Sequence, residues 1–192
     1  MQCKYFLENS AIGLRSLGES DLAEEYFQWL NDDEITRFID PGFFPNNWKS
    51  FRTFYESLKD CPNNIFLGIF WKKNGEHIGN VKLGPINWIH RYAPYSIVIG
   101  NKDYWGKGVC TEVTSLVCHH AFESLNLNRV HLGVVDKNIS AVKAYEKIGF
   151  KVEGVSKKYF WANNEYHDNI NMALLREEYI AAKKATNNSK ED

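Results

Sequence analysis

The sequence predicts an α/β fold with a central mixed, mostly antiparallel sheet and helices on both faces. The first observation is a strand meander, because the apolar segments 65–71 and 77–83 flank Asn74-Gly75, a dipeptide typical of type I′ hairpin turns. The second is a strand–helix–strand order within 95–135, which predicts one right-handed crossover between parallel strands. The third is a closing pair of apolar segments joined by a turn-like stretch, which adds a second hairpin.

The first third of the chain is expected to hold one strand and several helical segments. Residues 12–17 suit a strand, and 20–30 suit a helix that begins at a serine cap. Helical spacing continues over 33–39, stops at Pro41-Gly42 and resumes over 48–58.

The second half alternates strands and helices. A strand over 95–100 leads to a helix over 109–125, whose apolar residues share one face, and then to a strand over 129–135. Asn138 can cap a further helix that stops at Gly149, the residue type found just past helix ends. The closing hairpin is expected to consist of strands 151–160 and 166–175.

The length and composition fit one folded domain. The 192 residues are 44% hydrophobic and 24% charged, and we expect a domain over 1–176 followed by a polar tail over 177–192. A net charge of −1 lacks the basic excess that phosphate-backbone binding needs, so no nucleic-acid partner is expected. The absence of a long apolar run and of a signal-like start predicts a cytoplasmic protein without a membrane partner.

Cysteine and histidine usage does not suggest a disulfide scaffold or a metal site. The four cysteines lack CxxC spacing and are expected to be free thiols. Cys118-His119-His120 contains metal-ligand types, but consecutive helical residues point about 100° apart and cannot converge on one ion.

The most informative segment is Gly106-Lys107-Gly108, which stands between an expected strand and an expected helix. Two glycines allow a ligand to approach the backbone, and the first turn of a helix offers unpaired N–H groups, so an anion such as a diphosphate is the natural ligand. Thr111 stands where the GxGxxG dinucleotide pattern needs its last glycine, and no GxxxxGK[ST] pattern occurs. A simple glycine-rich turn is the alternative.

Two segments together resemble the GNAT superfamily of acetyltransferases: Trp105-Gly106-Lys107-Gly108-Val109-Cys110-Thr111-Glu112 and Asn138-Ile139-Ser140-Ala141-Val142-Lys143-Ala144-Tyr145-Glu146-Lys147-Ile148-Gly149-Phe150. Trp29-Leu30-Asn31-Asp32, Ile78-Gly79-Asn80 and Lys147-x-Gly149-Phe150-x-x-Glu153-Gly154 further resemble the branch that includes the ribosomal-protein N-terminal acetyltransferases. The resemblance covers residues 11–175. It implies acetyl transfer from acetyl-CoA, as cosubstrate, to an amine.

The resemblance also implies which residues bind the cofactor. Backbone amides from Gly106 through Thr111 would hold the CoA diphosphate, and the loop residues concerned are Trp105, Gly106, Lys107, Gly108, Val109, Cys110 and Thr111. The strand residues Val98, Ile99 and Gly100 would pair with the pantetheine arm, and Asn138 would lie beside it. Trp105 and Cys110 depart from the family pattern, which usually has Arg or Gln at the first position and Gly or Ala at the second.

Acyl transfer to an amine needs a neutral amine, a stabilised oxyanion and a proton for the departing thiolate. The family places a general-acid tyrosine at Tyr145, and a phenol of pKa about 10 can protonate a thiolate of pKa about 8.5. A core tyrosine is the alternative. Pro94 stands where many relatives of this branch carry a carboxylate, so the base is open between His90, a water chain and no strong base. A surface-loop role is the alternative for His90.

The acceptor is open among a nucleotide-linked amino sugar, a protein N terminus and a small amine, that is, a small-molecule or peptide amine. In relatives the segments corresponding to 41–48, 87–92 and 163–167 flank the thiol, so these are expected to set the choice; a homodimer is compatible with the sequence. A different class of function is a CoA-binding sensor or interaction module without turnover. Pro94 motivates that alternative, and Tyr145 argues against it.

Overall fold

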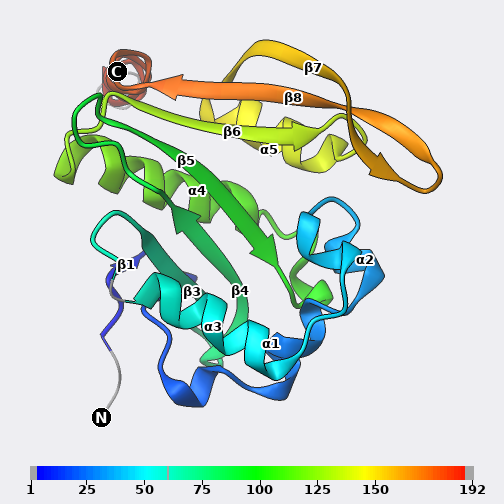
Figure 1. The fold of residues 1–192 in the computed structure, drawn as a ribbon. Helices are drawn as coiled ribbons and strands as arrows, with labels where there is room; N and C mark the ends of the chain where they lie inside the picture. Colours follow the sequence, from blue (N-terminus) through cyan, green and yellow to red (C-terminus); the bar gives the residue numbers. More distant parts are fainter. Residues whose placement is uncertain (1–3, 60, 189–192) are drawn as a thin grey trace.

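The computed structural model describes residues 4–59 and 61–188, and it confirms the α/β fold (Figure 1). One sheet has the order β1-β2-β3-β4-β5-β6-β8-β7, and β5–β6 is its parallel pair among antiparallel neighbours. The strands are β1 Leu7–Glu8, β2 Ile12–Arg15, β3 Ile65–Trp71, β4 Glu76–Leu83, β5 Tyr92–Ile99, β6 Arg129–Val135, β7 Lys151–Ala162 and β8 Glu165–Leu175.

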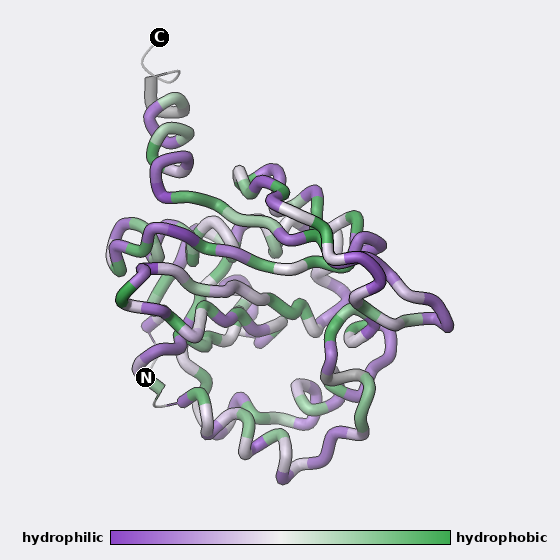
Figure 2. The backbone as a smooth tube through the Cα atoms, turned by 45° about the horizontal axis from the view of Figure 1, so that its top comes forward, coloured by the Kyte–Doolittle hydropathy of each residue, from purple (hydrophilic) through white to green (hydrophobic). Residues whose placement is uncertain are grey.

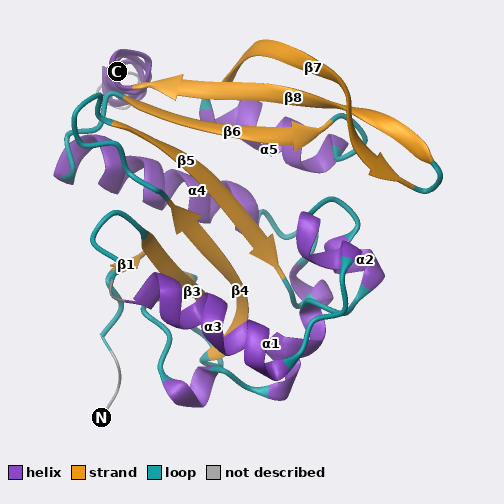
Figure 3. Cartoon of the chain, in the orientation of Figure 1, coloured by secondary structure: helices purple, strands orange, loops and turns teal. Residues whose placement is uncertain are grey.

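The helices lie on both faces of the sheet, as Figure 3 shows, with α1 and α3 on one face and α4 and α5 on the other. The α-helices are α1 Glu24–Trp29, α2 Asp33–Thr36, α3 Trp48–Lys59, α4 Val109–His119, α5 Ile139–Ile148 and α6 Arg176–Asn188. The short helical turns are η1 Glu19–Asp21, η2 Asp40–Phe43, η3 Lys102–Tyr104 and the π-helical η4 His120–Ser124.

Two apolar clusters fill the space between the sheet and its helices. The larger one joins the sheet to α4 and α5 and includes Val113 and Phe122, both fully buried. The smaller one is rich in aromatic residues, and Phe51 of α3 packs there edge-on against Tyr26 of α1, with 4.8 Å between ring centroids. The sheet and α4 therefore form a fixed frame, and α1 and α3 attach to its other face.

The first third differs most from the sequence expectation. The strand β1 was not expected, and the expected helix over 20–30 is divided into η1 and α1. The division has a local cause, because both Asp21 carboxylate oxygens accept hydrogen bonds from Arg15, at 2.6 and 2.8 Å, and one also accepts from the Gly18 N–H at 2.7 Å. This ion pair holds residues 18–21 as a turn, and the α-helix begins only after it.

The β3–β4 hairpin forms as expected, but the expected type I′ turn is wrong. That turn needs positive φ at both central residues. Gly75 has φ of 73°, whereas Asn74 is absent from the positive-φ residues, and the Gly75 N–H donates to the Trp71 carbonyl at 2.9 Å across a longer loop. Paired positive φ values occur instead in the β7–β8 turn, at Asn163 (51°) and Asn164 (61°).

The crossover β5–α4–β6 joins two parallel strands that separate soon after they meet. Pairing covers only Tyr92–Pro94 of β5 and Arg129–His131 of β6. Beyond these residues β5 remains paired with β4 and β6 with β8, so the two strands diverge into an open wedge. This wedge is the main interruption of the sheet in the described part of the chain.

The residues expected as a polar tail continue as helix α6, which leaves the body of the domain in Figure 2. Its first turns are attached, because the Tyr179 ring lies 5.1 Å from the Phe122 ring and the Tyr179 hydroxyl lies 2.8 Å from His119 Nδ1. Lys183 also pairs with Glu123 at 3.0 Å. Residues 189–192 lie outside the described residues.

Cys61, Cys110 and Cys118 are free thiols, and Cys3 lies outside the described residues. Within the described ranges, no group of three His, Cys, Asp or Glu side chains could hold a metal ion. His120 packs its ring against Phe6, at 5.0 Å between centroids. None of the described helices has the length and apolar character that crossing a membrane requires.

Candidate active site

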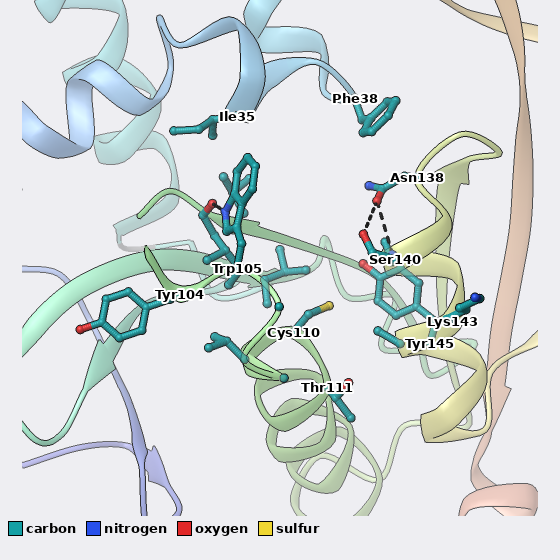
Figure 4. A pocket seen from close by; sticks show the side chains of 18 of the residues that line it. Ile35, Phe38, Tyr104, Trp105, Cys110, Thr111, Asn138, Ser140, Lys143 and Tyr145 are labelled. Carbon is teal, nitrogen blue, oxygen red and sulfur yellow. Dashed lines mark hydrogen bonds between the residues drawn. The ribbon is translucent and has the colours of Figure 1, made fainter. Parts of the chain in front are cut away.

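A cavity of about 480 Å³ opens where β5 and β6 part (Figure 4). Its walls come from α2, the end of β5, the loop before α4, the first turn of α4, and α5. Most of the expected cofactor residues line it, namely Val98, Ile99, Trp105, Gly106, Gly108, Val109, Cys110, Thr111, Asn138 and Tyr145. These expected residues are up to 47 positions apart in the sequence, from Val98 to Tyr145, and the fold gathers them around one opening.

Two expected residues are absent from the cavity wall. Gly100 is buried against α1, where an added Cβ would lie 1.9 Å from the Trp29 ring, so this glycine is required for close packing. The Lys107 ammonium lies 5.1 Å from the centroid of the Tyr104 ring. Only its backbone belongs to the loop that borders the opening.

The loop before α4 has the backbone geometry of an anion site. Gly106 and Gly108 have φ of 71° and 79°, values that residues with a Cβ rarely adopt. The first main-chain bond of α4 runs from the Glu112 N–H to the Gly108 carbonyl, at 3.1 Å. The N–H groups at 109–111 therefore precede the helical ladder, and together with the helix dipole they favour a bound anion.

The register of β5 decides which main-chain groups face the wedge. The Gly84 N–H donates to the Pro94 carbonyl and the Gly100 N–H to the Ile78 carbonyl, so the even-numbered residues of β5 bond to β4. The groups of Ile97 and Ile99 point instead toward the wedge. Val98 and Gly100 therefore do not offer their main chain to a ligand there, and Ile97, which the sequence did not single out, does.

Trp105 covers part of the β5 edge that faces the wedge. Its indole Nε1–H donates to the Ile99 carbonyl at 2.9 Å. Figure 4 shows the ring standing in the middle of the cavity, between Ile35 and Cys110. The free strand groups are consequently the Ile99 N–H and both main-chain groups of Ile97.

Tyr145 is buried at the α5 side of the cavity. Its ring packs edge-on to Tyr95, with 6.3 Å between centroids, and lies 5.7 Å from Phe150. Burial is the main cause that raises the pKa of Tyr145 well above its ordinary value, and the neighbouring Cys110 raises it further. The phenol therefore keeps its proton at neutral pH.

Asn138 fixes the position of this tyrosine. Its side chain caps α5 by accepting from the Ala141 N–H, at 3.4 Å, and from the Ser140 hydroxyl, at 3.2 Å (Figure 4). At the other end Gly149 adopts φ of 112° and ends the helix as expected. Because the helix is defined at both ends, Tyr145 reaches the cavity two turns after the cap.

A family model described as an acetyltransferase (GNAT) domain matches residues 12–151, which is most of the chain. The chain belongs to the GNAT acetyltransferase family. The spermidine N(1)-acetyltransferase of Vibrio cholerae is 31% identical over 176 residues, covering 90% of this chain and 97% of that enzyme. Its crystal structure in complex with CoA and spermine superimposes with a TM-score of 0.80 and 28% identity, covering 90% of this chain and 99% of that one.

Two further relatives show the range within the GNAT family. The spermidine N(1)-acetyltransferase of Escherichia coli (strain K12) is 37% identical over 111 residues, or 58% of this chain, and the match spans 59% of the length of that enzyme. A putative ribosomal N-acetyltransferase of Bacillus subtilis (strain 168) is 28% identical over 186 residues, covering 91% of this chain and 97% of that protein. These relatives support the GNAT family as a whole rather than its ribosomal-protein branch.

His90 does not lie near the GNAT cavity. It is exposed in the turn before β5, where its N–H donates to the Asn87 side chain at 2.8 Å and its ring stacks on Tyr92 at 6.4 Å. Five residues of β5, from Tyr92 to Ser96, lie between this turn and Ile97, and they span about 17 Å. The sequence offered His90 as a candidate base, but β5 begins at Tyr92 and runs away from His90 toward the cavity.

Of the three segments expected to contact the acceptor, the fold joins two. Phe43 at the end of η2 lies 5.6 Å from Phe160 of β7, and Phe160 pairs across the strands with His167 of β8. The segment 87–92 lies with His90 at the opposite end of β5. The sequence did not single out α2 and the residues after it, including Phe38, which form one wall of the cavity.

Proposed function

We propose that this chain transfers the acetyl group of acetyl-CoA to the primary amine of a small molecule. The observation that carries the proposal is the wedge between β5 and β6, which leads from the glycine loop at the start of α4 to the buried hydroxyl of Tyr145. A diphosphate at the loop and an extended arm along the free groups of Ile97 would bring a thioester to that hydroxyl. Membership of the GNAT family supports the same chemistry.

In the proposed reaction the amine nitrogen attacks the thioester carbonyl directly. The new C–N bond forms, the C–S bond breaks, and the Tyr145 hydroxyl gives its proton to the departing sulfur. The proton that the nitrogen loses after the attack passes to water and restores the Tyr145 hydroxyl. Backbone N–H groups at the wedge would stabilise the oxyanion. The ionisable side chains of the cavity, apart from Tyr145 and Cys110, are Glu34, Arg37, Tyr104, Lys143 and Lys147. Lys102 holds Glu34 at 2.8 Å, and the Tyr104 hydroxyl donates to Glu76 at 2.7 Å. We therefore propose that the amine enters neutral or loses its proton to water, with no strong base.

We propose a small-molecule acceptor, and polyamines are the first compounds to test because two of the relatives carry the name spermidine acetyltransferase. The aromatic contact between Phe43 and Phe160 supports a binding surface for the carbon chain or ring of such a molecule. The finer resemblance to the ribosomal-protein branch would favour a protein N terminus, and nucleotide-linked amino sugars complete the panel. A cytoplasmic location and a homodimer remain parts of the proposal.

The test is an acceptor screen with acetyl-CoA that detects both the free CoA thiol and the acetylated product by mass spectrometry. Spermidine, an amino-sugar nucleotide, an N-terminal peptide and an amino acid are compared at equal concentration. We expect thiol release to depend on a small-molecule amine and to yield one acetyl group per thiol. Release with the peptide alone would contradict the small-molecule acceptor. CoA binding with no thiol release from any amine would favour the sensor module, which the family membership does not favour.

A further inference from the structure

The loop before α4 lacks a side-chain cation that faces the cavity. Trp105 stands where the family pattern has Arg or Gln, and its indole N–H is engaged with the Ile99 carbonyl at 2.9 Å. Lys107 is directed at the Tyr104 ring, at 5.1 Å, and does not line the cavity. On this side an anionic ligand therefore meets backbone N–H groups and a neutral ring.

A cation is present on the opposite wall. Arg37 is exposed directly after α2 and lines the cavity that contains the loop. Its guanidinium carbon lies 4.9 Å from the Phe38 ring centroid and 5.9 Å from the Trp105 ring centroid. Both distances are within the range of cation–π contact. The two ring contacts place the guanidinium beside Trp105, the first residue of the loop.

Two acids of the α2 segment are paired with a lysine. Lys102 binds the carboxylates of Asp32 and Glu34 at 2.9 and 2.8 Å. The Lys102 hydrogen bond is the first cause that lowers the pKa of Asp32, against the opposing effect of burial. Among the ion pairs between described residues, none includes Arg37. A guanidinium offers a planar fork of donors that fits phosphate oxygens, so a phosphate is the ligand this position can take.

We propose that Arg37 binds the diphosphate of acetyl-CoA from the α2 side, opposite the loop amides, and supplies a positive charge that the side chains of the loop do not direct into the cavity. The inference rests on acetyl-CoA being the cosubstrate of the proposed function. A cofactor held by both walls restrains the segment from α2 to η2, whose last residue, Phe43, already contacts Phe160.

The experiment is calorimetric titration of wild type and Arg37→Gln with CoA, 3′-dephospho-CoA and pantetheine, without any acceptor. Hydrogen bonds to charged groups contribute enough that we expect Arg37→Gln to raise the Kd for CoA by about ten- to a hundredfold. The same factor is expected for 3′-dephospho-CoA, and no change is expected for pantetheine, which has no diphosphate. Arg37→Lys should recover part of the affinity, because it restores one charge without the fork.

The matched control is Arg52→Gln on α3, an exposed arginine paired with Glu19 at 3.1 Å and outside the cavity lining. It removes the same charge and should leave all three dissociation constants within about twofold. An Arg37→Gln effect that disappears with 3′-dephospho-CoA would assign the residue to the 3′-phosphate and overturn the proposal, as would an unchanged Kd for CoA. Because no acceptor is present, Arg37-dependent binding by a protein that never acetylates an amine would refute the proposed function alone.

Discussion

The substitution Tyr145→Phe removes one oxygen atom from the cavity and leaves the packing of the ring in place. The contacts with Tyr95 and Phe150 are made by the ring and are expected to persist. The hydroxyl that neighbours Cys110 is lost. The change therefore tests the proton donor without opening a hole in the core.

The expected effect on turnover is large and is confined to the chemical step. A positioned general acid contributes about 10²- to 10⁴-fold, so kcat should fall by that factor, which corresponds to about 2.7 to 5.4 kcal/mol of activation free energy. Binding of acetyl-CoA should change little, because the loop proposed to hold the diphosphate precedes α4, whereas Tyr145 belongs to α5. The pH dependence is a second signature, since burial raises the pKa of Tyr145 and its protonated, active form persists through pH 10.

The assay measures initial rates of CoA thiol release over pH 6 to 10 in wild type, Tyr145→Phe and Tyr95→Phe. Tyr95 is the matched control, because it is fully buried beside Tyr145 while its hydroxyl bonds to Thr114 at 2.7 Å rather than facing the cavity. Tyr95→Phe should cost about 1 kcal/mol of stability and leave kcat within about twofold. A kcat of Tyr145→Phe within twofold of wild type, or an equal loss in both variants, would refute the general-acid role.

Three further substitutions test the frame around the site by urea unfolding. Gly108→Ala should cost about 1–2 kcal/mol, because its φ of 79° is left-handed while the added Cβ meets nothing within 4 Å; an unchanged midpoint would exclude backbone strain there. Burial alone would raise the pKa of Asp21, but bonds from Arg15 and the Gly18 N–H outweigh it and leave that pKa lowered. The stabilisation is present above the ordinary value of 3.8 and is lost as pH falls through the lowered one, so Asp21→Asn should flatten the loss of stability below pH 5. Asp136 Oδ1 is buried without a hydrogen-bond partner, 3.9 Å from His167 Nδ1, so Asp136→Asn, which can donate to that nitrogen, should raise stability by about 1 kcal/mol, and a loss would contradict this account.

The elements that the sequence predicted best are those with local determinants. The strands β3 and β6 match the expected segments because each is a short, apolar run bounded by turn residues. Helix α5 begins and ends where Asn138 and Gly149 predict, since a side-chain cap and a left-handed glycine act within one turn of the helix. In these cases the few neighbouring residues contain the whole physical reason.

The elements that the sequence missed depend on contacts with residues outside the segment itself. Strand β1 consists of two residues whose pairing partners lie on β2, and apolar periodicity cannot detect so short a segment. The expected helix over 20–30 was divided by Arg15, which reaches six positions forward to Asp21. The same holds for the site. The register between β5 and β4 decides which main-chain groups of β5 face the wedge. The direction of β5 shows that His90 lies at the end away from the cavity.

This contrast separates two parts of the function. One wall of the cavity is local, since the glycine loop, the start of α4 and the capped α5 each form from a single stretch of sequence, and that wall determines the reaction class. The other wall is α2, which reaches the loop through the tertiary contacts of Lys102 with Asp32 and Glu34. Residues such as Arg37 and Phe38 can change there without disturbing the loop. We therefore expect sequence differences in the segment from α2 to η2 to account for differences between GNAT relatives in cofactor affinity and acceptor choice.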